Sequence, residues 1–169
     1  MNHLEMTVNA MQERFAAEAQ SYAGETTLLL APEHLLEAAQ ALNREFGFDV
    51  LIDETAVDYW PEQEPRFHLV YQLYAMAHNI LLRLRVPLNG NAPHIETLET
   101  VYLNANWKER EIWDMFGITF DGHSDLRRLI MPADWQGHPL RKDYPLGYEE
   151  VQFTFNAAEI DQRKPYAKE

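Results

Sequence analysis

Apolar and polar residues alternate most regularly in the middle of the chain, at 48–53, 67–76 and 80–86. A period of two is typical of antiparallel strands that place one face on a core and the other in water. The short interval at Ala77 and His78 predicts a tight hairpin between the second and third stretches. The apolar positions expected on the core face are Phe48, Val50, Ile52, Leu69, Tyr71, Leu73, Ile80, Leu82 and Leu84.

Helical spacing appears before and after these strands. A first helix is predicted over 4–20 and a second from Pro32 to Gly47, because proline suits the first turn of a helix and glycine its end. A short apolar run at 26–30 lies between them and predicts a strand. Turn-forming residues at 61–65 and 89–93 predict loops, and the second loop leads to helical regions at 95–102 and 107–116.

The helix at 107–116 is short and amphipathic. Ile112, Met115 and Phe116 recur at helical spacing, and Arg110 is four residues before Asp114, so we expect these two to form an ion pair. Gly117 can adopt the left-handed conformation that ends a helix.

No regular period persists after Gly117, because prolines and glycines interrupt every candidate element. The segment nevertheless carries aromatic residues and four cations, a composition that indicates an ordered arm rather than a disordered linker. We therefore predict an α+β fold: a two-layer domain with a mostly antiparallel sheet and an extended irregular C-terminal arm. The expected parts are an α+β domain at 1–116, an irregular docking arm at 117–148 and a C-terminal tail at 149–169.

Composition removes several classes of site. The chain of 169 residues has no cysteine, which excludes disulfides, thiolate zinc sites, cysteine-bound iron–sulfur clusters and a cysteine nucleophile. The net charge is -13, and residues 1–65 hold 13 acids against only Arg14 and Arg44. Such a front half repels nucleic acid and anionic membranes. No apolar stretch approaches the roughly 20 residues needed to cross a bilayer.

Candidate catalytic and metal-binding residues lack the spacing that their chemistry requires. Glu109, Glu111 and Asp114 have the carboxylates for acid–base catalysis, but on a charged helix we expect Arg110 to neutralise one of them and solvent or a partner's cations to take the rest. The two histidines of the arm, His123 and His138, lack the spacing of a helical zinc pair, and we expect them to make hydrogen bonds in turns. No glycine-rich phosphate loop or serine elbow is present.

The run from Glu109 to Ile130 resembles the signature of the C subunit of the proton-pumping NADH:quinone oxidoreductases, respiratory complex I. Its positions are filled by Glu109, Arg110, Glu111, Asp114, Met115, Phe116, His123, Arg127, Leu129 and Ile130. The Pro-Ala-Asp-Trp and His-Pro-Leu-Arg-Lys-Asp-Tyr-Pro stretches that follow also resemble the family. The partner-binding residues expected from this resemblance and from the anchor-rich arm are Glu109, Arg110, Glu111, Asp114, His123, Arg127, Arg128, Trp135, Arg141, Lys142 and Tyr144.

The resemblance implies a cofactor-free structural and assembly subunit of the peripheral arm of the complex. NADH, flavin, iron–sulfur clusters and quinone would be bound by partner chains. The expected partners are the large subunit that forms the quinone site and the subunit with the terminal iron–sulfur cluster, with no nucleic acid and only indirect membrane contact. The expected place is the cytoplasmic face of a bacterial plasma membrane. Two alternatives stay open: a ferredoxin-dependent or hydrogenase-type membrane complex, and a free-standing enzyme with a carboxylate–histidine site in the arm.

Overall fold

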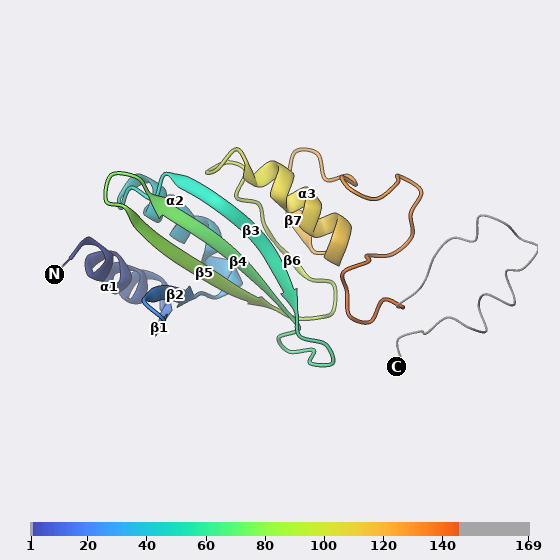
Figure 1. Cartoon of the computed structure of the whole chain (residues 1–169), viewed down its shortest axis with the longest axis horizontal. Helices are drawn as coiled ribbons and strands as arrows, with labels where there is room; N and C mark the ends of the chain where they lie inside the picture. Colours follow the sequence, from blue (N-terminus) through green and yellow to red (C-terminus); the bar gives the residue numbers. More distant parts are fainter. Residues whose placement is uncertain (1, 146–169) are drawn as a thin grey trace, which may run out of the picture.

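The fold is one mixed sheet with helices, followed by a smaller two-stranded unit and an irregular segment (Figure 1). The computed structural model describes residues 2–145. Along the chain the elements are α1 (His3–Phe15), β1 (Glu18–Tyr22), β2 (Glu25–Leu29), the 3-10 turn η1 (Pro32–His34), α2 (Leu35–Arg44), β3 (Val50–Asp58), β4 (Phe67–Ala75), β5 (Ile80–Leu88), β6 (His94–Glu96), α3 (Ala105–Phe116) and β7 (Thr119–Asp121).

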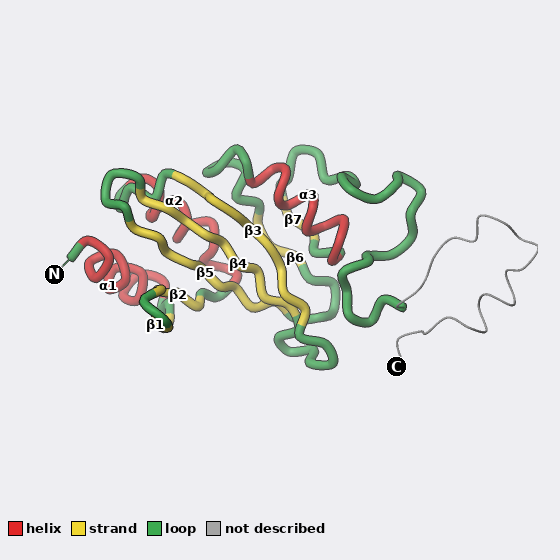
Figure 2. Tube along the Cα trace, in the orientation of Figure 1, coloured by secondary structure: helices red, strands yellow, loops and turns green. Residues whose placement is uncertain are grey.

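The larger sheet has the strand order β1-β2-β5-β4-β3, and only the β2–β5 pair is parallel. In Figure 2 helix α2 lies behind β4 and β5, while α3 lies beside β3. The predicted α+β fold with a mostly antiparallel sheet is confirmed. No helix in residues 2–145 is long and apolar enough to cross a membrane.

The β4–β5 hairpin follows the predicted alternation. Every second residue of β4, from Phe67 to Ala75, is fully buried, and Leu82, Leu84 and Val86 of β5 continue the same core face. The turn between the strands lies at 76–79, as predicted.

Strand β3 differs from the prediction in length and in face. The pairing with β4 is irregular between Leu51 and Asp53, which buries Leu51 and leaves Ile52 51% exposed. The strand then continues to Asp58, and its core face carries Glu54 and Asp58. A prediction that rests on alternating apolar residues ends the strand too early, because acidic residues occupy part of its core face.

The first predicted helix was too long. Helix α1 ends at Phe15, because Ala16 adopts a left-handed conformation with φ 51°. The residues after it form β1, an edge strand that is exposed at every position and is joined to β2 as a hairpin. A strand with no buried side chain leaves no apolar period in the sequence.

The helical prediction for 95–102 was wrong. Residues His94–Glu96 form β6, which pairs in parallel with β7 just beyond α3. The segment from Gly117 onward therefore begins with a short strand and becomes irregular only after Asp121. The last residues of the expected arm, 146–148, and the expected tail, 149–169, lie outside the described residues.

Candidate functional site

Helix α3 and the segment that follows it form the candidate site. The predicted apolar positions Ile112, Met115 and Phe116 are buried in the core. Gly117, at φ 75°, ends the helix in the predicted left-handed conformation. The helix also buries charge: Glu109, Arg110 and Asp114 are at most 6% exposed, whereas Glu111 is exposed. Buried charges need specific partners, so their contacts show what the signature holds together.

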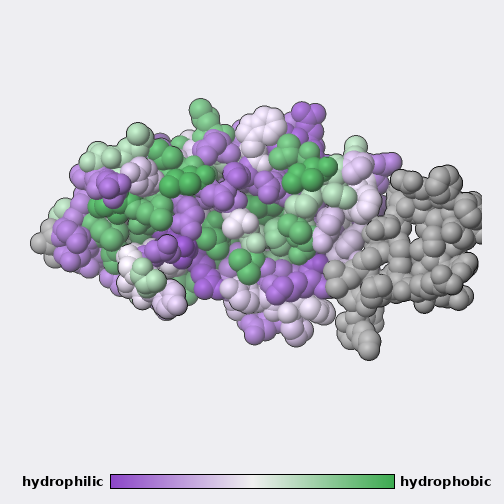
Figure 3. Space-filling view, in the orientation of Figure 1, coloured by the Kyte–Doolittle hydropathy of each residue, from purple (hydrophilic) through white to green (hydrophobic). Residues whose placement is uncertain are grey.

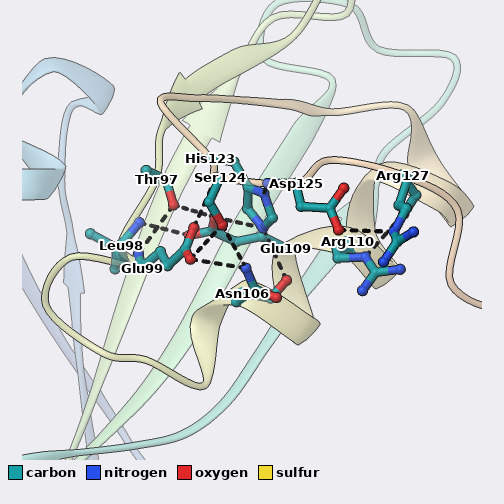
Figure 4. Close-up of polar contacts among 10 residues, drawn as sticks. All are labelled: Thr97, Leu98, Glu99, Asn106, Glu109, Arg110, His123, Ser124, Asp125 and Arg127. Carbon is teal, nitrogen blue, oxygen red and sulfur yellow. Dashed lines mark hydrogen bonds and ion pairs between the residues drawn. The ribbon is translucent and has the colours of Figure 1, made fainter.

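Glu109 fixes the turn that follows β6 (Figure 4). Its carboxylate accepts hydrogen bonds from the Thr97 hydroxyl at 2.5 Å and from the Leu98 amide at 2.6 Å. Burial raises the pKa of Glu109 to about 7, although these two donors oppose the increase. The signature glutamate thus links α3 to the 97–98 turn through hydrogen bonds within the chain.

His123 lies beside Glu109, and its side chain is fully buried. Its Nδ1 accepts a hydrogen bond from the Asp125 amide at 3.0 Å, so the other nitrogen, Nε2, carries the proton and donates to the Asn106 carbonyl at 3.0 Å. The Nε2 atom is also 3.9 Å from a carboxylate oxygen of Glu109. The histidine therefore makes the turn hydrogen bonds that the sequence predicts and ties the segment after β7 to α3.

Asp114 holds the next part of the segment. Its Oδ2 accepts the consecutive amides of Leu129, Ile130 and Met131 at 3.0, 2.8 and 2.9 Å, and its Oδ1 is 2.6 Å from Arg128. Burial opposes ionisation, but the amides and the guanidinium outweigh it and lower the pKa of Asp114.

The predicted ion pair between Arg110 and Asp114 is wrong. Arg110 instead donates to the carbonyls of Arg127 and Arg128, at 3.2 and 3.1 Å, and lies 5.0 Å above the Trp107 ring. Asp114 is already occupied by amides and by Arg128. Arg110 and Asp114, one turn apart, therefore hold the carbonyls and the amides of the same bend.

The far end of the segment is held at the end of the large sheet. Asp58 accepts the Lys142 amide at 2.8 Å, and both of its oxygens are bonded by Arg66 at 2.9 Å. Arg66 is also 2.8 Å from Asp143, and it lowers the pKa of Asp143 to about 2. The sequence prediction missed Asp58 and Arg66, and their only signal is an acid and a base that flank the Pro61–Pro65 loop.

Several cations expected to bind a partner are used inside the chain. Arg128 also donates to the carbonyls of Trp135 and Gly137 at 2.7 and 3.0 Å. Arg141 is 3.2 Å from Asp143 and lies 5.2 Å above the Phe67 ring. Arg127 pairs with Asp125 at 2.8 Å and keeps its side chain 71% exposed.

The remaining predicted anchors differ in exposure. Trp135 and Tyr144 are half-buried, and Tyr144 packs so closely on Gly137 that a Cβ there would lie 2.7 Å from its ring. Lys142 and Glu111 are exposed. In Figure 1 the segment, coloured orange, passes around the end of α3 and returns toward the sheet. It lies on its own domain along residues 123–143.

Exposed apolar side chains lie just before α3, in its first turn and on the bend that it holds. Leu103 is 85% exposed, while Trp107 and Ile130 are each 58% exposed. Figure 3 shows hydrophobic areas on this face of the molecule both over the sheet and near α3, with hydrophilic side chains between them. Among residues 2–145, no three His, Asp or Glu side chains are grouped closely enough to hold a metal ion.

The comparisons with known proteins agree with this arrangement. The family model described as "Respiratory-chain NADH dehydrogenase, 30 Kd subunit" matches residues 28–150. The C subunit of NADH-quinone oxidoreductase from Roseiflexus sp. (strain RS-1) is 43% identical over 150 residues, which is 88% of this chain and 86% of the relative. The same subunit of Geobacter sulfurreducens is 42% identical over 139 residues, which is 80% of this chain and 86% of the relative.

Two solved structures share the fold. A trypsin-resistant fragment (1-134) of Nqo5 is 28% identical, covers 74% of this chain and all of its own, and has a TM-score of 0.65. A chain of the archaeal membrane-bound sulfane sulfur reductase has a TM-score of 0.72 at 20% identity, with 83% of this chain and 84% of that chain covered. The second likeness shows the fold alone. The signature helix, the fold and the relatives together place the chain in the family of the C subunit of NADH:quinone oxidoreductase, respiratory complex I.

Proposed function

We propose that the chain is a structural and assembly subunit of the peripheral arm of complex I, and that it docks through α3 and the bend at 127–131. One observation supports this docking surface: the charged side chains of Arg110 and Asp114 bind the backbone of the bend and so are not available to a partner. Trp107, which lies against Arg110, and Ile130 of the bend are left exposed, and Leu103 is exposed just before α3. Exposed apolar groups on a rigid frame are typical of the centre of a protein interface.

The proposed surface is preformed, because the segment at 123–143 is held on its own domain by hydrogen bonds. Arg141, one of the expected partner-binding residues, is paired with Asp143 and packs on Phe67 within the chain. Arg127 and Lys142 keep exposed side chains and remain the cations proposed for a partner's acids.

The proposed partners are the large quinone-site subunit and the subunit with the terminal iron–sulfur cluster. NADH, flavin, clusters and quinone would be bound by partner chains, and the proposed place is the cytoplasmic face of a bacterial plasma membrane. A ferredoxin-dependent or hydrogenase-type complex is not favoured, because the relatives above 40% identity are C subunits of NADH-quinone oxidoreductases.

Co-purification with the tagged large subunit tests the docking surface. Ile130→Asp and Leu103→Asp place a charge in the proposed interface without removing a buried contact. Loss of about 2 kcal/mol at an interface anchor corresponds to roughly a thirtyfold weaker complex. The control is Met76→Asp, since Met76 is 63% exposed in the β4–β5 turn, away from α3.

We expect the control to co-purify like the wild type and both interface variants to be lost, with unchanged thermal stability in all three. Equal recovery of all variants would place the interface elsewhere. Elemental analysis and absorption spectra of the same purified chain test the proposal that it binds no cofactor, which bound iron or flavin at one per chain would contradict.

A further inference from the structure

Glu54 is a buried carboxyl group that the docking surface does not use. It lies on the core face of β3 and is 3% exposed, and neither of its carboxyl oxygens has a hydrogen-bond partner among the described residues. Its register partner on β4 is the fully buried Tyr71, which brings its hydroxyl close to the carboxyl group. If the Glu54 carboxyl group ionised here, it would lose its hydration, and little would compensate for the cost of burying the charge.

Glu109 is the second carboxyl group in this part of the core, and its surroundings differ. It accepts two short hydrogen bonds, from Thr97 and Leu98, which stabilise a negative charge. Helix α3 packs on β3, so the two glutamates are within electrostatic range of each other. Two carboxyl groups in one apolar space favour a state in which one ionises and the other keeps its proton.

The charged groups around the pair do not neutralise it. Two cations flank Glu109 in α3. Lys108 is paired with Asp53 of β3 at 2.7 Å, and Arg110 donates to carbonyl groups of the bend at 127–131. From the 97–104 turn, Glu99 adds negative charge. From the segment after β7, His123 contributes a ring whose Nε2 proton is donated to the Asn106 carbonyl (Figure 4).

We propose that Glu54 is a proton-holding site in the core: it stays a neutral acid while Glu109 carries the charge, and its ionisation at high pH loosens α3 from the sheet. Loss of the proton would put two negative charges between β3 and α3. Because α3 carries Arg110 and Asp114, the bend at 127–131 would be loosened with it. The docking face would then respond to pH through a group that it does not contain.

The sign of the effect follows from the pKa. Burial, followed by the charge of Glu109, raises the pKa of Glu54 well above its usual range. The folded chain then keeps a proton that the unfolded chain has already released, so stability is lost as pH rises toward the folded pKa. One retained proton makes the unfolding equilibrium constant rise about tenfold per pH unit. Glu109 has a pKa of about 7, so the alkaline interval above that value isolates Glu54.

Urea unfolding of the full chain over that interval tests the proposal. The wild type should show the tenfold rise per pH unit, whereas Glu54→Gln, which keeps the shape of the neutral acid, should be nearly flat. Glu111→Gln is the matched control, because Glu111 is an exposed glutamate of the same helix. Parallel profiles for the wild type and Glu54→Gln would overturn the proposal.

A second measurement does not depend on the variant. The side-chain carboxyl ¹³C resonance of Glu54 in the wild-type chain, assigned through its own backbone, should titrate only well above the ordinary glutamate range. A titration midpoint near the ordinary value of about 4.3 would contradict the proposal whatever Glu54→Gln does. Over the same alkaline interval, amide exchange at Leu129–Met131 should also rise more steeply in the wild type than in Glu54→Gln.

Discussion

Asp114 shows how one buried side chain sets the path of a segment that follows it in the chain. Three consecutive amides and Arg128 converge on its carboxylate, and the group is fully buried. The three amides belong to no helix or strand, so an acceptor outside regular secondary structure has to take their hydrogen bonds. The carboxylate does so while its charge is balanced by Arg128.

Removal of this carboxylate should cost far more than removal of an exposed one. Asp114→Ala leaves Arg128 and three amides without their acceptor, and breaking a buried pair costs about 3–5 kcal/mol of unfolding free energy. Glu111→Ala, on the exposed side of the same helix, should stay within about 0.5 kcal/mol of the wild type. Urea denaturation of both variants measures the difference. Similar losses would show that the Asp114 contacts contribute little to folding.

At the residue scale, the sequence identifies the signature helix but not the partners of its charged side chains. Arg110 and Asp114 have the spacing of an ion pair, and nothing local shows that a distant bend satisfies both. The residues that sequence analysis missed, Glu54, Asp58 and Arg66, are charged groups on or beside the core face of the sheet. An apolar pattern cannot place them.

At the scale of elements, predictions succeed where burial imposes a period. Strands β4 and β5, helix α2 and the final turns of α3 all have one buried face. Strand β1 has none, and β6 and β7 are three residues each, too short for any period to be recognised. Strands β6 and β7 pair in parallel because α3, which lies between them in the sequence, brings the chain back to the same end of the pair. Only the folded structure shows this connection.

The end of α3 provides a test at this scale. Gly117 has φ 75°, and a Cβ there would lie 2.6 Å from the His138 ring. Gly117→Ala should therefore lose about 1–2 kcal/mol to left-handed strain and about 1–3 kcal/mol more to displacement of His138. Gly47→Ala isolates the strain, because Gly47 has φ 69° and nothing within 4 Å of the added Cβ.

Thermal or urea unfolding of the two glycine variants gives the comparison. The larger loss at Gly117 should be accompanied by faster exchange of the Leu140 amide, which is bonded to the Met115 carbonyl at 3.0 Å. Equal losses in the two variants would mean that His138 moves aside without cost and does not hold the segment on α3.

At the scale of the whole molecule, pH acts in opposite directions at two places. Glu54 and Glu109 have raised pKa values, so the contact of α3 with the sheet is strongest in mild acid. Asp58, Asp114 and Asp143 have lowered pKa values, so the contacts that hold the irregular segment need a pH above the ordinary aspartate pKa of about 4. The sheet and the segment are thus held by groups with opposite responses to protons.

Acid should therefore release the segment before it affects the sheet. The stability that these three aspartates add is present above roughly pH 4 and is lost as the pH falls toward about 2, the folded pKa of Asp143. As the pH falls through the lowered pKa of Asp114, protection of the Leu129–Met131 amides should fall, because their acceptor becomes protonated. The amide of Leu69, in the centre of β4, should keep its protection, since the Glu54 and Glu109 contact is stabilised by acid. Hydrogen exchange followed by NMR on the full chain resolves both probes at once. A common loss of protection would show that the segment and the sheet unfold as one unit, and the preformed docking surface would then have no separate attachment to lose.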